Sequence, residues 1–473
     1  MNTPLRTLLY ELRNEYKEQP AFMFVEAGRV KTVFYEEFLQ DILSQSSHYQ
    51  RLTQTRIGLW GYNSYQWLTA AIGILLAGCH GIFFDGNLED HDLICLAEYS
   101  DTEWIAVDPE LMEEESSIGG CFPMEPYKSR QTAGTMEIRP EKDFMCFTSG
   151  TSSSSKGVVI STNALSICIR EAEGVIPGKR GERYFLPLPL HHIYGFTEVF
   201  HVLKRGGTLC LGRGGQYLME DIRLMDPHIA FFVPTMLQFL LKKKALPLHL
   251  HSVLTGGSYL RPELEQEALS QGLELYNLYG LSETLGMICS SKKEKGGQWL
   301  GPFGKIRFFT DSDGEILVQL PFHMDGYYKK EEETKQVLDS KSHIFHTGDG
   351  GEMDEDGWIC IKGRIRDTIV LENGEKIHGE DTDRLICELE GVEEGAVISL
   401  NGGLGAVIVP KAGWSEEQIR KSVEHFNKRR AAFLRIRQIW LRKEKLPRTS
   451  TGKLKRFCLE QEYGKGENNG ISV

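Results

Sequence analysis

The sequence lacks any cysteine arrangement that would indicate disulfides or a structural metal. Ten cysteines are scattered through 473 residues, with no Cys-x-x-Cys pair and no Cys/His spacing typical of zinc. This pattern favours free thiols in a reducing compartment over a disulfide framework or a zinc site. The N-terminal stretch MNTPLRTLLYELRNEYKEQP contains acids early and no apolar core of signal-peptide length. We therefore expect a cytoplasmic protein.

Positive charge is not in excess. The chain has 54 Lys and Arg against 66 Asp and Glu, a net charge of −12. This balance argues against a general binder of nucleic acid or of anionic membranes. One local exception runs from Lys428 to Arg456, where many basic residues accompany a single acid, Glu444. That stretch is either a solvated helix face or an anion site.

Only one uncharged run, from Trp67 to Phe84, reaches the lower limit for a membrane span. It contains His80, and its glycines at 78 and 81 separate a helical part from a short strand. We expect a buried helix followed by a strand, and no stable membrane insertion.

A Walker-type Gly-Lys-Ser/Thr sequence is also absent, yet a different phosphate-binding pattern is present. The stretch FTSGTSSSSKG, from Phe147 to Gly157, follows a short apolar run that predicts a buried strand. Its backbone N–H groups, its hydroxyls and the ammonium of Lys156 suit an oligophosphate. A flexible Ser-rich linker is the alternative.

Short apolar runs such as Arg56–Trp60 and Trp104–Val107 alternate with helical stretches such as Ser64–Ala77 from about residue 56 onward, and a further helical stretch is expected at Ser415–Lys428. Such alternation indicates βαβ units and a mostly parallel sheet. The runs end in small or polar turns, and ligands of open α/β sheets bind beyond the carboxyl ends of the strands. After Gly301, Asp-Gly and Asn-Gly pairs predict hairpins. The length predicts two or three domains.

Further motifs follow the Ser-rich stretch in a fixed order. They are PLPLHHIYG (187–195), YGLSET (279–284), TGD (347–349), GRIRD (363–367) and PRTSTGK (447–453). Together they resemble the core motifs of the adenylate-forming superfamily, which comprises acyl-CoA synthetases, adenylation domains and luciferases. The resemblance extends from about residue 30 to 457, nearly the whole chain.

The resemblance implies an α/β fold in two domains. Residues 1–363 would form a large nucleotide- and acid-binding domain of stacked βαβ layers with a small β-barrel-like part. Residues 364–473 would form a small, mobile α+β domain that carries the catalytic lysine. Arg366 would be the hinge, where the family usually has Asp or Lys.

The family reaction couples a carboxylic acid to ATP, which gives an acyl adenylate and pyrophosphate, and a thiol then attacks the mixed anhydride. Both reacting groups are anionic, so the site needs cations and N–H donors. The resemblance implies the cofactors ATP and Mg²⁺, with coenzyme A as co-substrate. The implied catalytic residues are Lys453, His192, Thr148 and Glu283, and Glu283 is also the implied magnesium ligand.

The resemblance assigns residues to the two substrates as well. The implied ATP-binding set is Thr148, Ser149, Gly150, Thr151, Ser152, Lys156, Gly256, Gly257, Ser258, Asn277, Tyr279, Gly280, Ser282, Asp349, Arg364 and Lys453. The implied acid-binding set is His192, Ile193, Phe196, Val233, Gly257, Leu281 and Met287. Asp349 would accept the ribose hydroxyls, for which an acceptor-only group is suited.

The phosphate stretch departs from the family pattern. Ser152 to Ser155 replace a segment that commonly contains Gly and Pro, and Gly379 stands where the family often has Pro. Backbone angles that suit glycine are less accessible to serine. We expect phosphate binding to survive.

His192 favours one branch of the family. Amino-acid-activating members typically carry an Asp in that region, whereas this chain has His192 among mostly apolar neighbours. We therefore predict an acid–CoA ligase for a fatty or aryl acid. The alternative is a stand-alone enzyme that loads an acyl or aminoacyl group onto a separate carrier protein. A non-catalytic nucleotide-binding regulator would be expected to lack Lys453 or Glu283, and a luciferase-like oxygenase would share the motifs.

Overall fold

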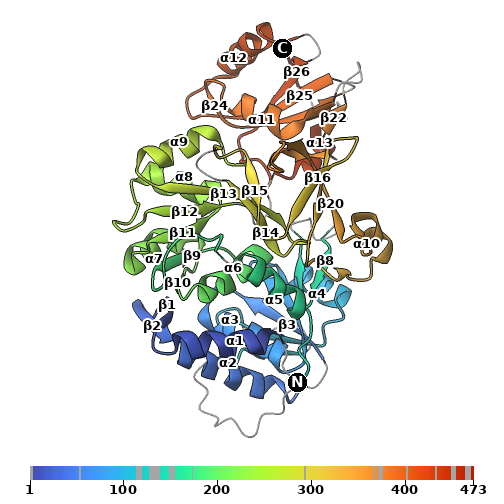
Figure 1. Ribbon diagram of the computed structural model, residues 1–473. Coiled ribbons are helices and arrows are strands. Elements are labelled where there is room, and N and C mark those ends of the chain that lie inside the picture. Colours follow the sequence, from blue (N-terminus) through green and yellow to red (C-terminus); the bar gives the residue numbers. More distant parts are fainter. Residues whose placement is uncertain are drawn as a thin grey trace. The chain divides into compact units, whose positions relative to one another are not determined.

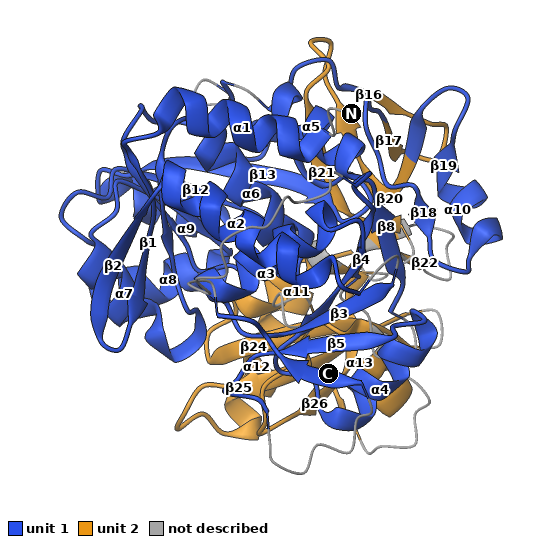
Figure 2. Cartoon of the chain, turned by 90° about the horizontal axis from the view of Figure 1, so that it is seen from below, with its two compact units in different colours: residues 1–307, 319–345 blue, residues 308–318, 346–473 orange. Residues whose placement is uncertain are grey.

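The computed structural model (Figure 1) describes residues 4–52, 55–112, 120–126, 139–148, 155–172, 174–291, 295–365, 368–370, 376–400, 403–431, 434–448, 454–463 and 470–473. The chain divides into two compact units, as Figure 2 shows. Unit 1 comprises residues 1–307 and 319–345, and unit 2 comprises residues 308–318 and 346–473. The predicted domain boundary at 363/364 lies within unit 2 and stays a prediction.

The first sheet of unit 1 has the strand order β18-β8-β7-β4-β3-β5-β6. Its strands are β3 (Arg56–Gly61), β4 (His80–Asp85), β5 (Trp104–Val107), β6 (Cys121–Pro123), β7 (Phe144–Phe147), β8 (Gly157–Ile160) and β18 (Gly326–Tyr327). The pairs β3–β4, β3–β5, β4–β7 and β5–β6 are parallel, and β8 is antiparallel to both neighbours. Helices α3 (Tyr65–Leu76) and α4 (Asp90–Tyr99) connect these strands. The predicted βαβ alternation is confirmed.

The larger sheet of unit 1 runs in the order β15-β14-β13-β12-β11-β9-β10-β1-β2. Its strands are β1 (Pro20–Glu26), β2 (Arg29–Phe34), β9 (Arg183–Leu186), β10 (Thr208–Leu211), β11 (Ile229–Phe232), β12 (Ser252–Thr255), β13 (Glu274–Leu281), β14 (Gly286–Ser291) and β15 (Leu300–Pro302). From β1 to β13 the neighbours are parallel. Every residue of β10, β11 and β12 is buried, as strands covered on both faces require.

Helices surround these sheets in unit 1. They are α1 (Pro4–Tyr16), α2 (Tyr35–Tyr49), α5 (Thr162–Glu171), α6 (Ile193–Lys204), α7 (Leu218–Met225), α8 (Pro234–Lys243), α9 (Pro262–Ser270) and α10 (Glu331–Val337). A 3₁₀ turn (Gly215–Tyr217) and β19 (Leu338–Asp339) complete the unit. Helix α6 is buried along almost its whole length. Phe196 of α6 packs on Phe83 and Phe144 of the first sheet, with ring centroids 5.1 and 5.2 Å apart.

Within the described residues, unit 2 contains three groups of paired strands and three helices. The strands are β16 (Arg307–Thr310), β17 (Glu315–Gln319), β20 (Ile344–Met353), β21 (Ile359–Arg364), β22 (Thr368–Val370), β23 (Lys376–His378), β24 (Val392–Leu400), β25 (Gly403–Pro410), β26 (Ile436–Leu441) and β27 (Ile471–Ser472). The helices are α11 (Gly379–Cys387), α12 (Glu416–Lys428) and α13 (Arg456–Tyr463). The predicted turns at Asp313-Gly314 and Asp356-Gly357 join strands, and both glycines have φ near +80°. The predicted turn at Asn373-Gly374 lies outside the described residues.

The uncharged run from Trp67 to Phe84 forms most of α3 and then β4, as predicted. Ser64 caps α3 by accepting a hydrogen bond from the backbone N–H of Trp67. Across the described ranges, no helix combines the length and the apolar character needed to cross a membrane. All ten cysteines are free thiols.

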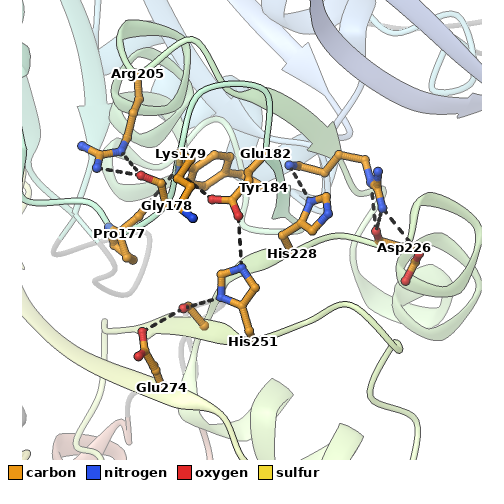
Figure 3. Close-up of polar contacts among 12 residues, drawn as sticks. Pro177, Gly178, Lys179, Glu182, Tyr184, Arg205, Asp226, His228, His251 and Glu274 are labelled. Carbon is orange, nitrogen blue, oxygen red and sulfur yellow. Dashed lines mark hydrogen bonds and ion pairs between the residues drawn. The ribbon is translucent and has the colours of Figure 1, made fainter.

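A polar cluster lies at the amino ends of the parallel strands in the larger sheet (Figure 3). His251, just before β12, contacts Glu182 at 3.3 Å, and His228, just before β11, accepts a hydrogen bond from the backbone N–H of Arg183 at 3.0 Å. The imidazole of His228 lies 6.0 Å from that of His249 and 6.3 Å from that of His251. Burial lowers the pKa of His228, and the nearby Arg183 guanidinium lowers it further.

Candidate active site

The Ser-rich stretch joins β7 to β8, which form a hairpin. These strands pair antiparallel from Phe144 with Ile160 to Phe147 with Gly157. At the root of the hairpin, the backbone N–H of Lys156 donates to the hydroxyl of Thr148 at 3.0 Å. Ser149, Gly150, Thr151 and Ser152 lie outside the described residues. The described root shows that the stretch connects paired strands rather than linking two domains.

Lys156 is held by two neighbours. Its Nζ lies 2.6 Å from Oε2 of Glu333 and 4.4 Å from the ring centroid of Tyr327. Hydrogen bonds from Lys156 and Lys330 lower the pKa of Glu333. The Lys156 side chain is 31% exposed, so an added anion can reach its ammonium.

Glu283 follows the end of β13 in a tight turn. The hydroxyl of Thr284 accepts a hydrogen bond from the backbone N–H of Leu281 at 3.0 Å, and Thr284 is fully buried. The turn brings Gly280 so close to Gly286 that a Cβ on Gly280 would lie 1.8 Å from the Gly286 carbonyl oxygen. The motif therefore requires glycine here for steric reasons.

The carboxylate of Glu283 is oriented by Tyr327 of β18, whose hydroxyl donates to Oε1 at 2.7 Å. Tyr327 was not among the residues predicted from the sequence. It lies 44 positions from Glu283 in a two-residue strand, and only the pairing of β18 with β8 brings it here. No local pattern identifies it.

Gly256 and Gly257 follow the end of β12, and Asn277 lies on the adjacent strand β13. Thr255, the last residue of β12, pairs with Asn277 of β13, and Gly257 has φ +81°. The side chain of Asn277 donates to the carbonyl of Gly297 at 2.7 Å. Tyr279, Gly280 and Ser282 continue the same strand and its turn. These predicted residues are therefore neighbours along two adjacent strands.

His192 caps the N-terminus of α6. Its Nδ1 accepts a hydrogen bond from the backbone N–H of Tyr194 at 3.3 Å. The adjacent His191 lies 3.5 Å from Asp85, and burial lowers the pKa of His191 although Asp85 raises it.

The predicted acid-binding residues divide into two groups. Ile193 and Phe196 are buried in α6, and Phe196 belongs to the aromatic core with Trp67, Phe83 and Phe144. Val233 caps α8, and its Cγ1 would lie 3.6 Å from a Cβ on Gly257. Leu281 and Met287 are buried at the ends of β13 and β14. The assignment of each to the acid stays a prediction.

Asp349 and Arg364 form a pair within unit 2. They stand opposite each other on β20 and β21, and Arg364 Nε lies 2.9 Å from Asp349 Oδ1. The hydroxyl of Thr347 accepts from the backbone N–H of Asp349 at 3.0 Å. Asp349 is 4% exposed. Arg366 and Lys453 lie outside the described residues.

In the part of the chain that the structure describes, no three His, Cys, Asp or Glu side chains form a group that could hold a metal. Magnesium at nucleotide sites is usually bound by one or two carboxylates together with substrate phosphates. A single carboxylate oriented by a tyrosine hydroxyl, as at Glu283, fits that mode.

Comparison with known proteins agrees with the motifs. The profile of the family described as AMP-binding enzyme matches residues 11–328. A 2-succinylbenzoate–CoA ligase of Staphylococcus epidermidis is 23% identical over 451 residues, covering 92% of this chain and 94% of that one. The long-chain-fatty-acid–CoA ligase FadD13 of Mycobacterium tuberculosis is 26% identical over 357 residues, covering 68% and 67%.

Solved structures show the same fold. The o-succinylbenzoate CoA synthetase of Bacillus subtilis, bound to its acyl-adenylate intermediate, superimposes with a TM-score of 0.84 at 20% identity and covers 98% of this chain and 99% of its own. The anthranilate CoA ligase AuaEII, bound to anthranoyl-AMP, has a TM-score of 0.83 at 19% identity and covers 98% and 97%. The predicted α/β adenylate-forming fold is confirmed. This chain belongs to the AMP-binding enzyme family.

Proposed function

We propose that this protein is an AMP-forming acid–CoA ligase. It joins a carboxylic acid to the α-phosphate of ATP, releases pyrophosphate, and then transfers the acyl group from the acyl adenylate to the thiol of coenzyme A. One observation supports this above the others. Tyr327 contacts both Glu283 and Lys156, the carboxylate assigned to the metal and the ammonium assigned to the phosphates.

The phosphates are held by the hairpin root and the loop it carries. Lys156 exchanges Glu333 for phosphate oxygens, and the Thr148 hydroxyl with the serines of residues 149–152 supplies hydrogen bonds. Glu283 and Ser282 stand at the β13 turn, where a bound Mg²⁺ would neutralise phosphate charge. Fixed cations and N–H dipoles lower the barrier because charge accumulates on the phosphate during attack.

The nucleoside is assigned to two groups of residues. Gly256, Gly257, Ser258, Asn277, Tyr279 and Gly280 would frame the adenine. Asp349 would accept the ribose hydroxyls, since a carboxylate is suited to accepting hydrogen bonds and Arg364 holds this one in place. Lys453 would stabilise the charge at the α-phosphate, and rotation about Arg366 would carry the 364–473 domain between the two half-reactions.

The acid is assigned to the β-strand ends beside α6. His192, Ile193, Phe196, Val233, Gly257, Leu281 and Met287 form the proposed acid set. The side chains other than His192 are apolar or absent, which favours a fatty or aryl acid over an amino acid.

Coenzyme A is the proposed acceptor. The exposed Lys428 and Arg429 at the end of α12, followed by Arg430, offer positive charge for its phosphates. A separate carrier protein is the competing acceptor.

The identity of the acyl acceptor is tested by measuring the mass of the thioester product. The protein is incubated with ATP, Mg²⁺ and an acid, and either coenzyme A or a pantetheine-bearing carrier protein is added. The proposal predicts acyl-CoA and AMP in equal amounts. Thioester formed on the carrier alone, with none on coenzyme A, would contradict it.

A further inference from the structure

The carboxylate of Glu333 lies between two lysine ammonium groups. Its Oε2 is 2.6 Å from Nζ of Lys156, and its Oε1 is 3.1 Å from Nζ of Lys330. The Glu333 side chain is 38% exposed, so solvent and ligands can reach it. Hydrogen bonds from Lys156, and next from Lys330, lower the pKa of Glu333, so its carboxylate is charged at neutral pH. An anion of this chain therefore already contacts the ammonium that we assign to the phosphates of ATP.

Helix α10, which carries Glu333, is fixed against strand β18. The hydroxyl of Thr334 accepts a hydrogen bond from the backbone N–H of Tyr327 at 2.9 Å and donates to the carbonyl of Lys330 at 3.0 Å. A Cβ built on Gly326 would lie 3.1 Å from Cγ2 of Thr334, which shows how closely the helix approaches the strand. The backbone position of Glu333 is therefore set by this packing as well as by its contacts with the lysines.

Lys156 is held beside the same strand. Val158 of β8 pairs with Tyr327 of β18, and the carbonyl of Gly157 accepts a hydrogen bond from the backbone N–H of Tyr328 at 2.8 Å. Lys156 immediately precedes β8, and Glu333 follows β18 on the adjoining helix. The contact between Lys156 and Glu333 is therefore built into the pairing of two strands.

The neighbouring acid on α10 makes a different contact. Glu332 lies 2.6 Å from Nζ of Lys335, and its side chain is 81% exposed. Glu332 and Glu333 thus have the same charge and lie on the same helix, but it is Glu333 that contacts Lys156. This pair of residues separates a local effect of the carboxylate from a general effect of negative charge.

Glu333 and a phosphate group would compete for Lys156. A partly exposed ion pair is weak, so a triphosphate with its higher charge can displace the carboxylate. The displaced carboxylate would remain close to the phosphates and repel them, because like charges a few ångströms apart interact unfavourably. AMP lacks the β- and γ-phosphates and would not meet this competition.

We propose that Glu333 is a positioning residue that competes with the β- and γ-phosphates of ATP for the ammonium of Lys156. This inference rests on the proposed function and describes the regulation of the same site. Before ATP binds, Glu333 holds the Lys156 ammonium beside the ring of Tyr327. After adenylate formation, the same carboxylate competes with pyrophosphate. The affinity for ATP is lower as a result, and pyrophosphate dissociates faster.

Glu333→Gln tests the proposal because it removes the charge and keeps the size of the side chain. Calorimetric titrations measure the Kd of Mg²⁺-ATP, of Mg²⁺-pyrophosphate and of AMP, with no acid present. The Kd values for ATP and pyrophosphate should fall by about threefold to fivefold, the effect of one partly exposed ion pair. The Kd for AMP should stay unchanged. Should Glu333→Gln fail to bind AMP, Glu333→Ala carries the same expectations.

Glu332→Gln is the matched control, since it makes the same change of net charge on the same helix. It should leave all three Kd values unchanged. A second comparison tests whether Glu333 acts through Lys156. In a protein that already carries Lys156→Met, adding Glu333→Gln should not increase the affinity for ATP, because substitutions at two residues in contact are not additive.

Several results would overturn the inference. The competition is refuted if Glu333→Gln binds AMP normally and binds ATP no more tightly than the wild type does. An equal gain in affinity for AMP, or an equal gain in Glu332→Gln, would show a general effect of charge. A gain that persists beside Lys156→Met would show that Glu333 does not act through Lys156.

The proposed function is tested separately by ATP–pyrophosphate exchange in the wild type. Exchange with a fatty or aryl acid, together with an unchanged ATP affinity in Glu333→Gln, would overturn this inference alone. A wild type that binds neither ATP nor pyrophosphate would refute the proposed function and this inference with it.

Discussion

The hydroxyl of Tyr327 donates a hydrogen bond to Oε1 of Glu283 over 2.7 Å, and the same ring lies 4.4 Å from the ammonium of Lys156. One tyrosine therefore touches the residues assigned to the metal and to the phosphates. It fixes the Glu283 carboxylate before ATP arrives, which reduces the reorganisation that binding requires.

Tyr327→Phe should raise the concentration of Mg²⁺-ATP needed for half-maximal exchange by about fivefold, the equivalent of one hydrogen bond. The ring and its contact with Lys156 remain. Tyr328→Phe is the control, because its neighbouring hydroxyl binds Asp101 at 2.6 Å instead. Equal effects of the two variants would show that Tyr327 does not act through Glu283.

Lys156→Met should weaken ATP binding by about tenfold or more, since a cation–phosphate hydrogen bond is lost. The folding stability should change by less than about 1 kcal/mol, as is usual for partly exposed ion pairs. Lys330 is the second lysine that contacts Glu333, with its Nζ 3.1 Å from Oε1. Lys330→Met should leave the affinity for ATP nearly unchanged. Calorimetric titration with ATP measures both variants. Intact affinity in Lys156→Met would refute the phosphate assignment.

Gly280→Ala should destabilise the fold by about 3 kcal/mol, because its Cβ would overlap the carbonyl of Gly286 and the strands would have to separate. Gly272→Ala is the comparison. No atom lies within 4 Å of its added Cβ, so only its φ of +82° opposes alanine, at a cost of about 1 kcal/mol. Urea-unfolding curves give the stability of both variants. An unfolding midpoint for Gly280→Ala above that for Gly272→Ala would contradict the close approach of β13 and β14.

The histidine cluster in Figure 3 predicts a loss of stability in mild acid. His228 faces Arg183, Glu182, His251 and His249, and burial lowers its pKa below the ordinary value of 6.5. Above pH 6.5, folded and unfolded chains both hold it neutral. Below that pH the unfolded chain takes up the proton first, so the free energy of unfolding falls as pH falls.

His228→Asn should flatten this pH dependence, since its side-chain oxygen can still accept from the backbone N–H of Arg183. His91→Asn, at a side chain that is 87% exposed, should retain the slope of the wild type. Unfolding midpoints measured across the range from pH 7.5 to about 5 compare the three proteins. If the unfolding midpoint of His228→Asn falls with pH as steeply as that of the wild type, His228 is not the cause of the pH dependence.

Much of the fold was predictable because strands and helices alternate with clear local patterns. The strands at Arg56–Gly61 and Trp104–Val107 and the helices at Tyr65–Leu76 and Glu416–Lys428 match their predicted ranges within one or two residues. Helix α6 was not predicted, because a mostly apolar, buried run is not easily distinguished from a strand by its sequence. The assignment of residues 308–318 to unit 2 was equally inaccessible, since it depends on contacts with residues after 346.

The motifs place several candidate site residues in the chain. Glu283, Asp349 and Lys156 were assigned from the resemblance of their motifs to the family, and their roles stay predictions; the structure adds the neighbours that contact them. Tyr327 and Glu333 were missed because their partners are brought together only by tertiary structure. Lys453 and Arg366 stay predictions from the motifs.

The central claim is that the chain activates a carboxylic acid as its adenylate. ATP–pyrophosphate exchange with acetate, medium- and long-chain fatty acids, aryl acids and amino acids measures that step alone. The account predicts Mg²⁺-dependent exchange with fatty or aryl acids and none with amino acids. Exchange restricted to amino acids would contradict the interpretation of His192, and no exchange in protein that binds ATP would contradict acid activation itself.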